Sequence, residues 1–174
     1  IILIMTRYSR QISLPEIGEG GQEKLHKARV LIVGAGGLGS PAALYLAGAG
    51  VGTIGLADDD TVGISNLQRQ VLYTENEVGQ LKVHCAAQRL RALNGNIEVH
   101  AYPFRLNREN ARRLIADYDI VVDGCDNFST RYLISDSCSA LRRMGKTAYL
   151  FPNPETTARY LPYVAQFFAP ANFV

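Results

Sequence analysis

The chain has 174 residues, of which 47% are hydrophobic and 20% charged, as expected for one globular domain of about 100–200 residues. A formal net charge of +2 provides no strongly basic field that would argue for nucleic-acid binding. The longest apolar runs are far shorter than the roughly 18–20 residues of a membrane span, and the first residues lack the features of a signal peptide. Three cysteines without Cys-x-x-Cys spacing favour neither a disulfide framework nor a zinc site. We therefore expect a cytoplasmic enzyme or binding domain with no membrane or nucleic-acid partner.

Short apolar runs alternate with helical periods along the chain. Strands are predicted over residues 30–33, 53–57, 97–101, 120–122 and 147–151, and helices over 38–49, 81–93, 107–116 and 129–144. A run that is apolar at every position, such as 30–33, is typical of a strand buried on both faces. The alternation predicts an α/β fold, with a doubly wound, mainly parallel, Rossmann-like sheet flanked by helices.

Two segments are assigned as domains. Residues 1–150 are predicted to form a nucleotide-binding domain. Residues 151–174 are interrupted by four prolines and show no periodicity, so they are interpreted as an irregular or truncated C-terminal extension.

Glycines and a carboxylate follow the first two predicted strands. Gly34, Gly36, Gly37 and Gly39 form a strand-to-helix turn, which lets backbone N–H groups and the helix N-terminus approach a phosphate. Asp58 lies 19 residues after Gly39, where a carboxylate can accept hydrogen bonds from ribose hydroxyls. Together they indicate a nucleotide site, but this pair does not separate a nicotinamide cofactor from ATP. The alternative is a glycine turn that serves only helix–strand packing.

The segment Ser65-Asn66-Leu67-Gln68-Arg69-Gln70 distinguishes the two nucleotides. In a helical turn, Asn66 and Arg69 lie on the same face, where an amide and a guanidinium suit a polyphosphate. Lys82, at the start of the next helix, is expected to reach the same phosphates. The alternative is a solvated polar turn followed by a surface lysine.

Asp126 follows the fourth predicted strand and is a candidate magnesium ligand, because Mg²⁺ favours carboxylate and phosphate oxygens. The alternative is helix capping by Asp126, or by Asn127 and Ser129. The neighbouring Cys125 is interpreted as a small buried residue. The three histidines are scattered without ligand spacing and receive no role.

Together these residues resemble the ThiF/MoeB/HesA family of adenylyltransferases, the bacterial relatives of ubiquitin-activating enzymes. The resemblance covers about residues 7–146, and two details, Ala47-Gly48-Ala49-Gly50 and Asp58-Asp59-Asp60, make it slightly more ThiF-like. The other matching motifs are Arg7-Tyr8-Ser9-Arg10-Gln11-Ile12, Gly34–Gly39, Ser65–Gln70, Lys82, Cys125-Asp126-Asn127 and Thr130-Arg131-Tyr132.

The resemblance implies an enzyme that uses ATP and Mg²⁺ to adenylate the C-terminal glycine of a small ubiquitin-like sulfur carrier in thiamine or molybdopterin synthesis. By position, Asp58 would hold the ribose and Asp126 the magnesium. Arg10 would enter the nucleotide site of a partner subunit, which implies a homodimer. The residues implied for the phosphates are Asn66, Arg69 and Lys82.

The chain departs from the family pattern after Gly145, where neither the family's two Cys-x-x-Cys zinc pairs nor its reactive-cysteine segment is present. The chain is therefore expected to be truncated or to have a diverged tail. Two alternative functions remain. An NAD(P)-dependent oxidoreductase would explain the glycine turn and Asp58 but would leave Asn66, Arg69 and Lys82 without a role. A non-catalytic remnant would bind ATP without transferring its adenylyl group.

Overall fold

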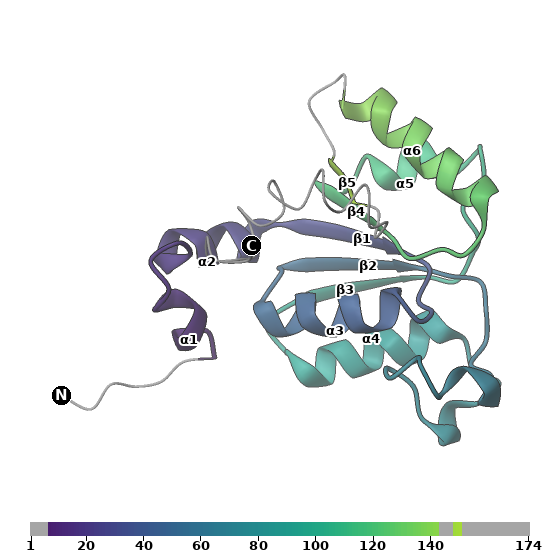
Figure 1. Ribbon diagram of the computed structural model, residues 1–174, viewed down its shortest axis with the longest axis horizontal. Coiled ribbons are helices and arrows are strands. Elements are labelled where there is room, and N and C mark those ends of the chain that lie inside the picture. The colour runs from purple at the N-terminus through teal and green to yellow at the C-terminus, as the bar shows by residue number, and fades with distance from the viewer. Residues whose placement is uncertain (1–6, 143–147, 151–174) are drawn as a thin grey trace.

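The computed structural model describes residues 7–142 and 148–150, which form a parallel sheet with helices on both faces (Figure 1). The described strands lie in the order β3-β2-β1-β4-β5, and each neighbouring pair is parallel. They are β1 (Arg29–Val33), β2 (Thr53–Ala57), β3 (Glu98–Tyr102), β4 (Ile120–Asp123) and β5 (Ala148–Leu150). The order confirms the predicted doubly wound, Rossmann-like sheet, with its reversal of strand order between β1 and β4.

Two pairs of helices cover the sheet, with α3 and α4 on one face and α5 and α6 on the other (Figure 1). The helices are α1 (Ser9–Ile12), α2 (Gly18–Lys27), α3 (Gly39–Ala49), α4 (Lys82–Leu93), α5 (Ala111–Ile115) and α6 (Phe128–Arg142), with short 3-10 helices η1 (Ile64–Asn66) and η2 (Glu75–Glu77). None of the helices in the described ranges is long and apolar enough to cross a membrane.

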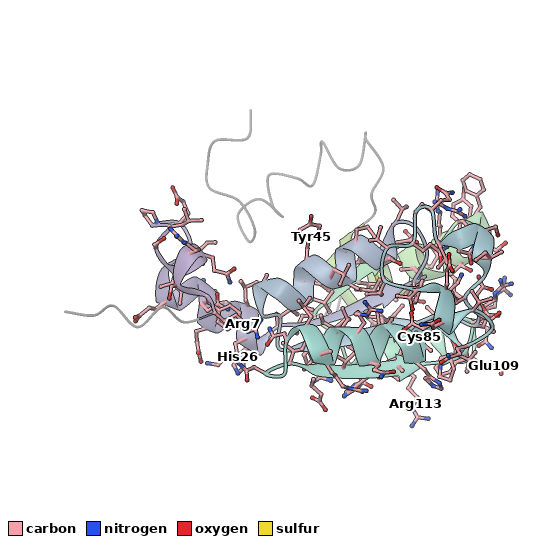
Figure 2. The ribbon with its side chains drawn as sticks, turned by 90° about the horizontal axis from the view of Figure 1, so that it is seen from below. Arg7, His26, Tyr45, Cys85, Glu109 and Arg113 are labelled. Carbon is pink, nitrogen blue, oxygen red and sulfur yellow. The ribbon has the colours of Figure 1, made fainter. Side chains whose placement is uncertain are left out.

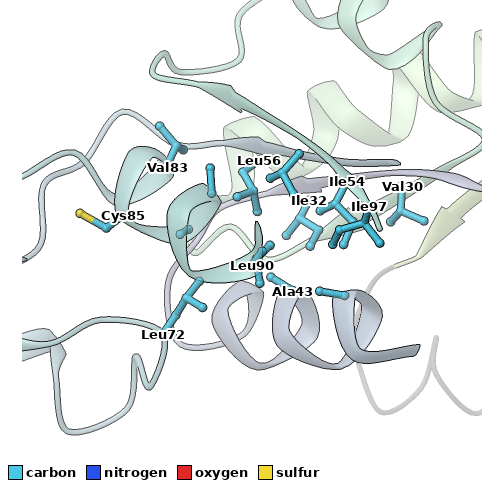
Figure 3. Packing of buried hydrophobic residues seen from close by; sticks show 14 of the residues in the cluster. Val30, Ile32, Ala43, Ile54, Leu56, Leu72, Val83, Cys85, Leu90 and Ile97 are labelled. Carbon is cyan, nitrogen blue, oxygen red and sulfur yellow. The ribbon is translucent and has the colours of Figure 1, made fainter. Parts of the chain in front are cut away.

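The central strand β1 is buried on both faces, as its sequence predicts. Val30 and Ile32 belong to the core beneath α3 and α4, whereas Leu31 and Val33 belong to the core beneath α5 and α6. Figure 3 shows the first of these cores, where residues of β1 and β2 meet Ala43 of α3. The alternation follows from the two-residue period of a strand, and the two cores hold β1 and its following loop in place.

The structure corrects some details of the predicted helices. The segment predicted as a helix over 107–116 is helical only in α5. Residues 108–110 form a turn ahead of it, in which the Asn107 side chain accepts hydrogen bonds from the N–H groups of Glu109 and Asn110, the pattern of a helix cap. In α3, Ala43 and Ala47 are fully buried, while Leu38, the first residue of the predicted helix, precedes α3 and is half exposed. The interpretation of residues 151–174 as an extension lies outside the described residues.

The N-terminal helices α1 and α2 lie at the amino ends of the strands (Figure 1). Tyr8, beside α1, packs against Gly50 before β2 and accepts a hydrogen bond from Asn94 before β3 (2.8 Å). Figure 2 shows Arg7 and His26 at this end of the molecule and Glu109 at the opposite end. Arg10 on α1 is exposed. It therefore lies away from the carboxyl ends of the strands, where the candidate site is found.

Candidate functional site

A pocket of about 520 Å³ lies beyond the carboxyl ends of β1, β2 and β4, where ligands bind in doubly wound sheets. Residues from the three loops that follow these strands line it together. The lining includes nearly all the residues predicted for the site: Gly34, Gly36, Gly37, Asp58, Asn66, Arg69, Lys82 and Asp126. The structure thus brings together residues that are far apart in the sequence.

Two glycines shape the turn between β1 and α3. Gly34 has φ +88°, which L side chains rarely adopt, and a Cβ there would lie 2.7 Å from the carbonyl oxygen of Gly124. A Cβ on Gly39 would lie 1.8 Å from the carbonyl oxygen of Gly34. Since α3 begins at Gly39, this close packing places the helix N-terminus directly behind the turn, where its N–H groups can face an anion.

The other two glycines leave the turn open to the pocket. A Cβ on Gly36 would meet the Gln70 side chain at 3.5 Å, and one on Gly37 would meet Arg69 at 3.4 Å. These are ordinary contact distances. The absence of side chains here exposes the backbone beside a carboxamide and a guanidinium.

Asp58 connects the end of β2 to the glycine turn. Its Oδ2 accepts a hydrogen bond from the Ala35 N–H at 2.7 Å, and its Oδ1 accepts one from the Asp60 N–H at 2.8 Å. The backbone therefore fixes the orientation of this carboxylate at the pocket. Each oxygen keeps a second lone pair, so Asp58 can accept further hydrogen bonds from hydroxyl groups.

Asn66 and Arg69 lie in one turn, as predicted. The Arg69 N–H donates to the Asn66 carbonyl at 3.1 Å, and Asn66 Oδ1 accepts from the Gly63 N–H at 3.1 Å, which leaves its Nδ2 as the donating side of the amide. The exposed Arg69 side chain extends over Gly37, and its Nη1 donates to the Ser65 carbonyl at 3.3 Å. Arg69 therefore points toward the glycine turn rather than away from it.

Lys82 is almost completely buried at the start of α4, with 5% of its side chain exposed. Its Nζ lies 2.8 Å from Oδ2 of Asp60, which is 62% exposed. A second ion pair, at 3.5 Å, joins Asp59 to Arg105. The Lys82 ammonium is thus not a free surface charge, and its carboxylate partner lies at the wall of the same pocket.

Asp126 and Asn127 have different roles in the structure. Asn127 Oδ1 accepts a hydrogen bond from the Thr130 N–H at 2.9 Å, so the predicted alternative of helix capping belongs to Asn127. Asp126 is exposed at the pocket, and no hydrogen bond or ion pair joins it to another described residue. Its carboxylate is available to a ligand or a hard cation.

Cys125 is buried beside Asp126, as predicted, and its thiol donates to Asp123 at 2.7 Å. Burial and this hydrogen bond raise the pKa of the Cys125 thiol to about 12. A thiol in this state is protonated at neutral pH and is a poor nucleophile. The chemistry of the pocket therefore depends on its charged and amide groups.

The sequence prediction gave no role to Gln70, Arg105 and Arg131, which also line the pocket, although Gln70 and Arg131 stand in motifs that it singled out. Arg105 follows β3, so the rule on strand carboxyl ends that identified the other loops applies to it as well. Arg131 donates from Nε and Nη2 to the Cys125 carbonyl at 3.2 and 2.9 Å. Its signal in the sequence was the Thr130-Arg131-Tyr132 motif, one turn into the helix after β4. Arg10, in contrast, is not brought to the pocket of its own chain.

Comparisons with known proteins agree with this geometry. The ThiF family model matches residues 8–148. The chain is 55% identical over 139 residues to an "Adenylyltransferase and sulfurtransferase MOCS3" of Anopheles gambiae, covering 80% of this chain and 32% of the relative. It is 52% identical over 137 residues to the "Sulfur carrier protein adenylyltransferase" of Thermus thermophilus, covering 79% and 51%. The chain thus spans about a third to a half of the length of these relatives.

Solved structures share the fold. The E. coli tRNA N6-threonylcarbamoyladenosine dehydratase TcdA in complex with ATP matches with a TM-score of 0.70 at 28% identity, covering 77% of this chain and 54% of that one. The same protein in complex with AMP gives a TM-score of 0.73 at 27% identity, covering 77% and 53%. Both of these neighbours are complexes with adenine nucleotides.

Proposed function

The chain belongs to the ThiF family, and on that premise we propose that it binds ATP and adenylates the C-terminal carboxylate of a small ubiquitin-like sulfur carrier. The observation that carries this proposal is the meeting of Asn66, Arg69 and Lys82 around an open glycine turn. The names of the relatives support the activity, since two of them are adenylyltransferases and one names a sulfur carrier. A cytoplasmic location is part of the proposal, because the three cysteines are free thiols.

We assign the parts of the nucleotide to the pocket as follows. Asp58 accepts from the ribose hydroxyls, and the glycine turn with the start of α3 receives phosphate oxygens. Arg69 binds phosphate through its planar fork of N–H groups, and Asn66 donates from its amide. Lys82 acts as a point charge. Its ammonium group either leaves Asp60 to bind a phosphate or binds both groups together.

Asp126 is proposed as the magnesium ligand. Its carboxylate faces the pocket without a partner in the described part of the chain, and carboxylate and phosphate oxygens are the ligands that Mg²⁺ prefers. The residues present therefore fit the ion. When bound, magnesium would neutralise part of the negative charge of the phosphates.

The proposed reaction needs positioning and charge neutralisation more than proton transfer. A C-terminal carboxylate, with a usual pKa of about 3.3–3.7, is already ionised at neutral pH. One of its oxygens forms a bond to the α-phosphorus, the bond from that phosphorus to the bridging oxygen breaks, and pyrophosphate leaves with the electron pair. The pocket's cations stabilise the charge on the leaving group. No general base is required.

We further propose that Arg10 acts in the pocket of a partner subunit of a homodimer. Arg10 is exposed on α1, which lies at the amino ends of the strands (Figure 1), while the pocket lies beyond their carboxyl ends. An arginine at this end of the sheet can serve a nucleotide site only when another copy brings its pocket there.

ATP–pyrophosphate exchange tests the proposal. The full chain is incubated with ATP, Mg²⁺ and labelled pyrophosphate, together with a thiamine-pathway or a molybdopterin-pathway carrier. Exchange that depends on one carrier supports adenylation and identifies the pathway. ATP binding without exchange with either carrier would favour the non-catalytic remnant. Binding of NADH but not ATP would favour the oxidoreductase.

A further inference from the structure

Gln70 carries an unusual buried group. Its side chain lines the pocket and is only 4% exposed. Its Oε1 is buried, and among the described residues it is the one buried side-chain nitrogen or oxygen without a hydrogen-bond partner. Buried amide groups are nearly always hydrogen-bonded, because an unpaired one loses its bonds to water without replacement. The unpaired oxygen therefore indicates a partner that arrives from outside the chain.

The backbone around Gln70 is held firmly against the glycine turn. Its N–H donates to the Asn66 carbonyl at 2.9 Å, and its carbonyl accepts from the Tyr73 N–H at 3.2 Å. The Tyr73 hydroxyl in turn donates to the Ala35 carbonyl at 2.8 Å. This chain of contacts connects the Gln70 segment to the turn after β1. The backbone that carries the carboxamide is thus held beside the pocket before any ligand binds.

The surroundings of the carboxamide place it at the phosphate end of the proposed nucleotide site. Its Nε2 lies 3.5 Å from the point where a Cβ on Gly36 would stand, and the neighbouring Arg69 side chain lies over Gly37. A carboxamide has N–H groups that can donate to phosphate oxygens and an oxygen that can accept from a hydrating water. A polyphosphate with its bound water offers both partners.

We propose that Gln70 is a nucleotide-positioning residue, whose carboxamide binds a polyphosphate and a water that accompanies it. This inference rests on the proposed ATP site. Gln70 holds the phosphates against the glycine turn, while the charged side chains neutralise them. A residue built only for stability would have its oxygen paired within the protein. A ligand-positioning residue instead keeps an unpaired group in the ligand-free protein and pairs it on binding.

Replacing Gln70 by methionine separates these two roles, because methionine has nearly the same length and shape without the unpaired oxygen. The matched control is Gln68→Met, two residues away at a position that does not line the pocket. The melting temperature of each full-length variant is measured without ligand. Calorimetric titrations then compare ATP, inorganic tripolyphosphate and adenosine.

We expect Gln70→Met to raise the melting temperature by about 2–4 °C while it weakens binding of ATP and tripolyphosphate about tenfold. Adenosine binding should stay unchanged, and the control should alter neither property. A lower melting temperature with unchanged ATP affinity would assign Gln70 a purely structural role and overturn the inference. An equal loss for adenosine would also overturn it, because Gln70 would then serve the base or the ribose.

A second variant, Gln70→Glu, covers the case in which the methionine variant does not fold. It keeps the shape of the side chain and adds a negative charge, so ATP affinity should fall by more than tenfold while adenosine affinity is retained. Unchanged ATP affinity in this variant would overturn the inference. The wild-type titration keeps the two proposals distinguishable. If wild type binds ATP and the Gln70 variants bind it equally well, only the role of Gln70 fails, whereas a wild type that binds no ATP removes both.

Discussion

Substitution of Arg69 is the most direct perturbation of the candidate site. The side chain is exposed, extends over Gly37 with its Cδ at 3.4 Å from the position of a Cβ there, and makes a hydrogen bond of 3.3 Å to the Ser65 carbonyl. It fills no core volume. Arg69→Ala should therefore change the free energy of unfolding by less than about 0.5 kcal/mol, as expected for a surface substitution.

The effect on ATP binding should be much larger. Hydrogen bonds to charged groups contribute about 1.5–3 kcal/mol, which corresponds to a roughly 10- to 150-fold loss of affinity when the guanidinium is removed. Arg69→Lys keeps the charge but loses the planar fork, so its affinity should lie between those of wild type and the alanine variant. Isothermal titration of the full chain with Mg-ATP measures all three, and thermal melting checks the fold.

Arg113→Ala is the matched control, because Arg113 is an exposed arginine of the α5 segment that does not line the pocket (Figure 2). It removes the same charge from the chain, so a change in overall electrostatics would appear in both variants. The control should bind ATP like wild type. If Arg69→Ala, folded normally, also binds ATP within about twofold of wild type, Arg69 does not contact the phosphates and the proposed site is wrong.

Three other features can be tested by substitution. Gly39→Ala should destabilise the fold by roughly 3 kcal/mol of overpacking, because its Cβ would stand 1.8 Å from a backbone oxygen. The melting temperature should therefore fall by about 6–12 °C. The control Gly36→Ala makes an ordinary 3.5 Å contact and should melt within about 2 °C of wild type. Arg10→Ala and Asp126→Ala should each abolish exchange alone, yet mixing the two subunits should restore activity, since each hybrid dimer keeps one intact site; no recovery would contradict a shared site. Burial raises the pKa of the Cys138 thiol to about 12. From about pH 9 upward the unfolded chain loses this proton while the folded protein keeps it, so the free energy of unfolding should fall as the pH rises. Denaturant melts measure this fall, which should be less steep in Cys138→Ala.

The sequence predicts the centre of the fold well, because the central strands are apolar at nearly every position. The segment that forms β2 agrees with its predicted bounds, 53–57. The helix after β3 is predicted too long at its start, since residues 108–110 form a turn ahead of α5, although the Asn107 side chain makes the hydrogen bonds of a helix cap there. In α3, buried Ala43 and Ala47 reflect how closely the helix approaches the sheet, which depends on tertiary packing.

The convergence of the site residues is predictable because the carboxyl ends of parallel strands share one edge of the sheet. That rule places Asp58, Asn66 and Lys82 together from the order of the strands alone. The rule does not give the partners within the site. The bond between Lys82 and Asp60 joins residues 22 positions apart, and the burial of Gln70 depends on how its turn packs against the glycine loop. Such details require the three-dimensional arrangement.

The pairing of Lys82 with Asp60 is part of a wider balance of charge around the pocket. Among the described residues that line it, four are acidic, namely Asp58, Asp59, Asp60 and Asp126, and four are basic, namely Arg69, Lys82, Arg105 and Arg131. The cavity is therefore formally neutral before anything enters it. Discrimination for an anion then arises from where the donors stand and not from surplus positive potential. A chain with a net charge of only +2 can in this way recognise a highly charged small molecule without a basic exterior that would attract unrelated polyanions.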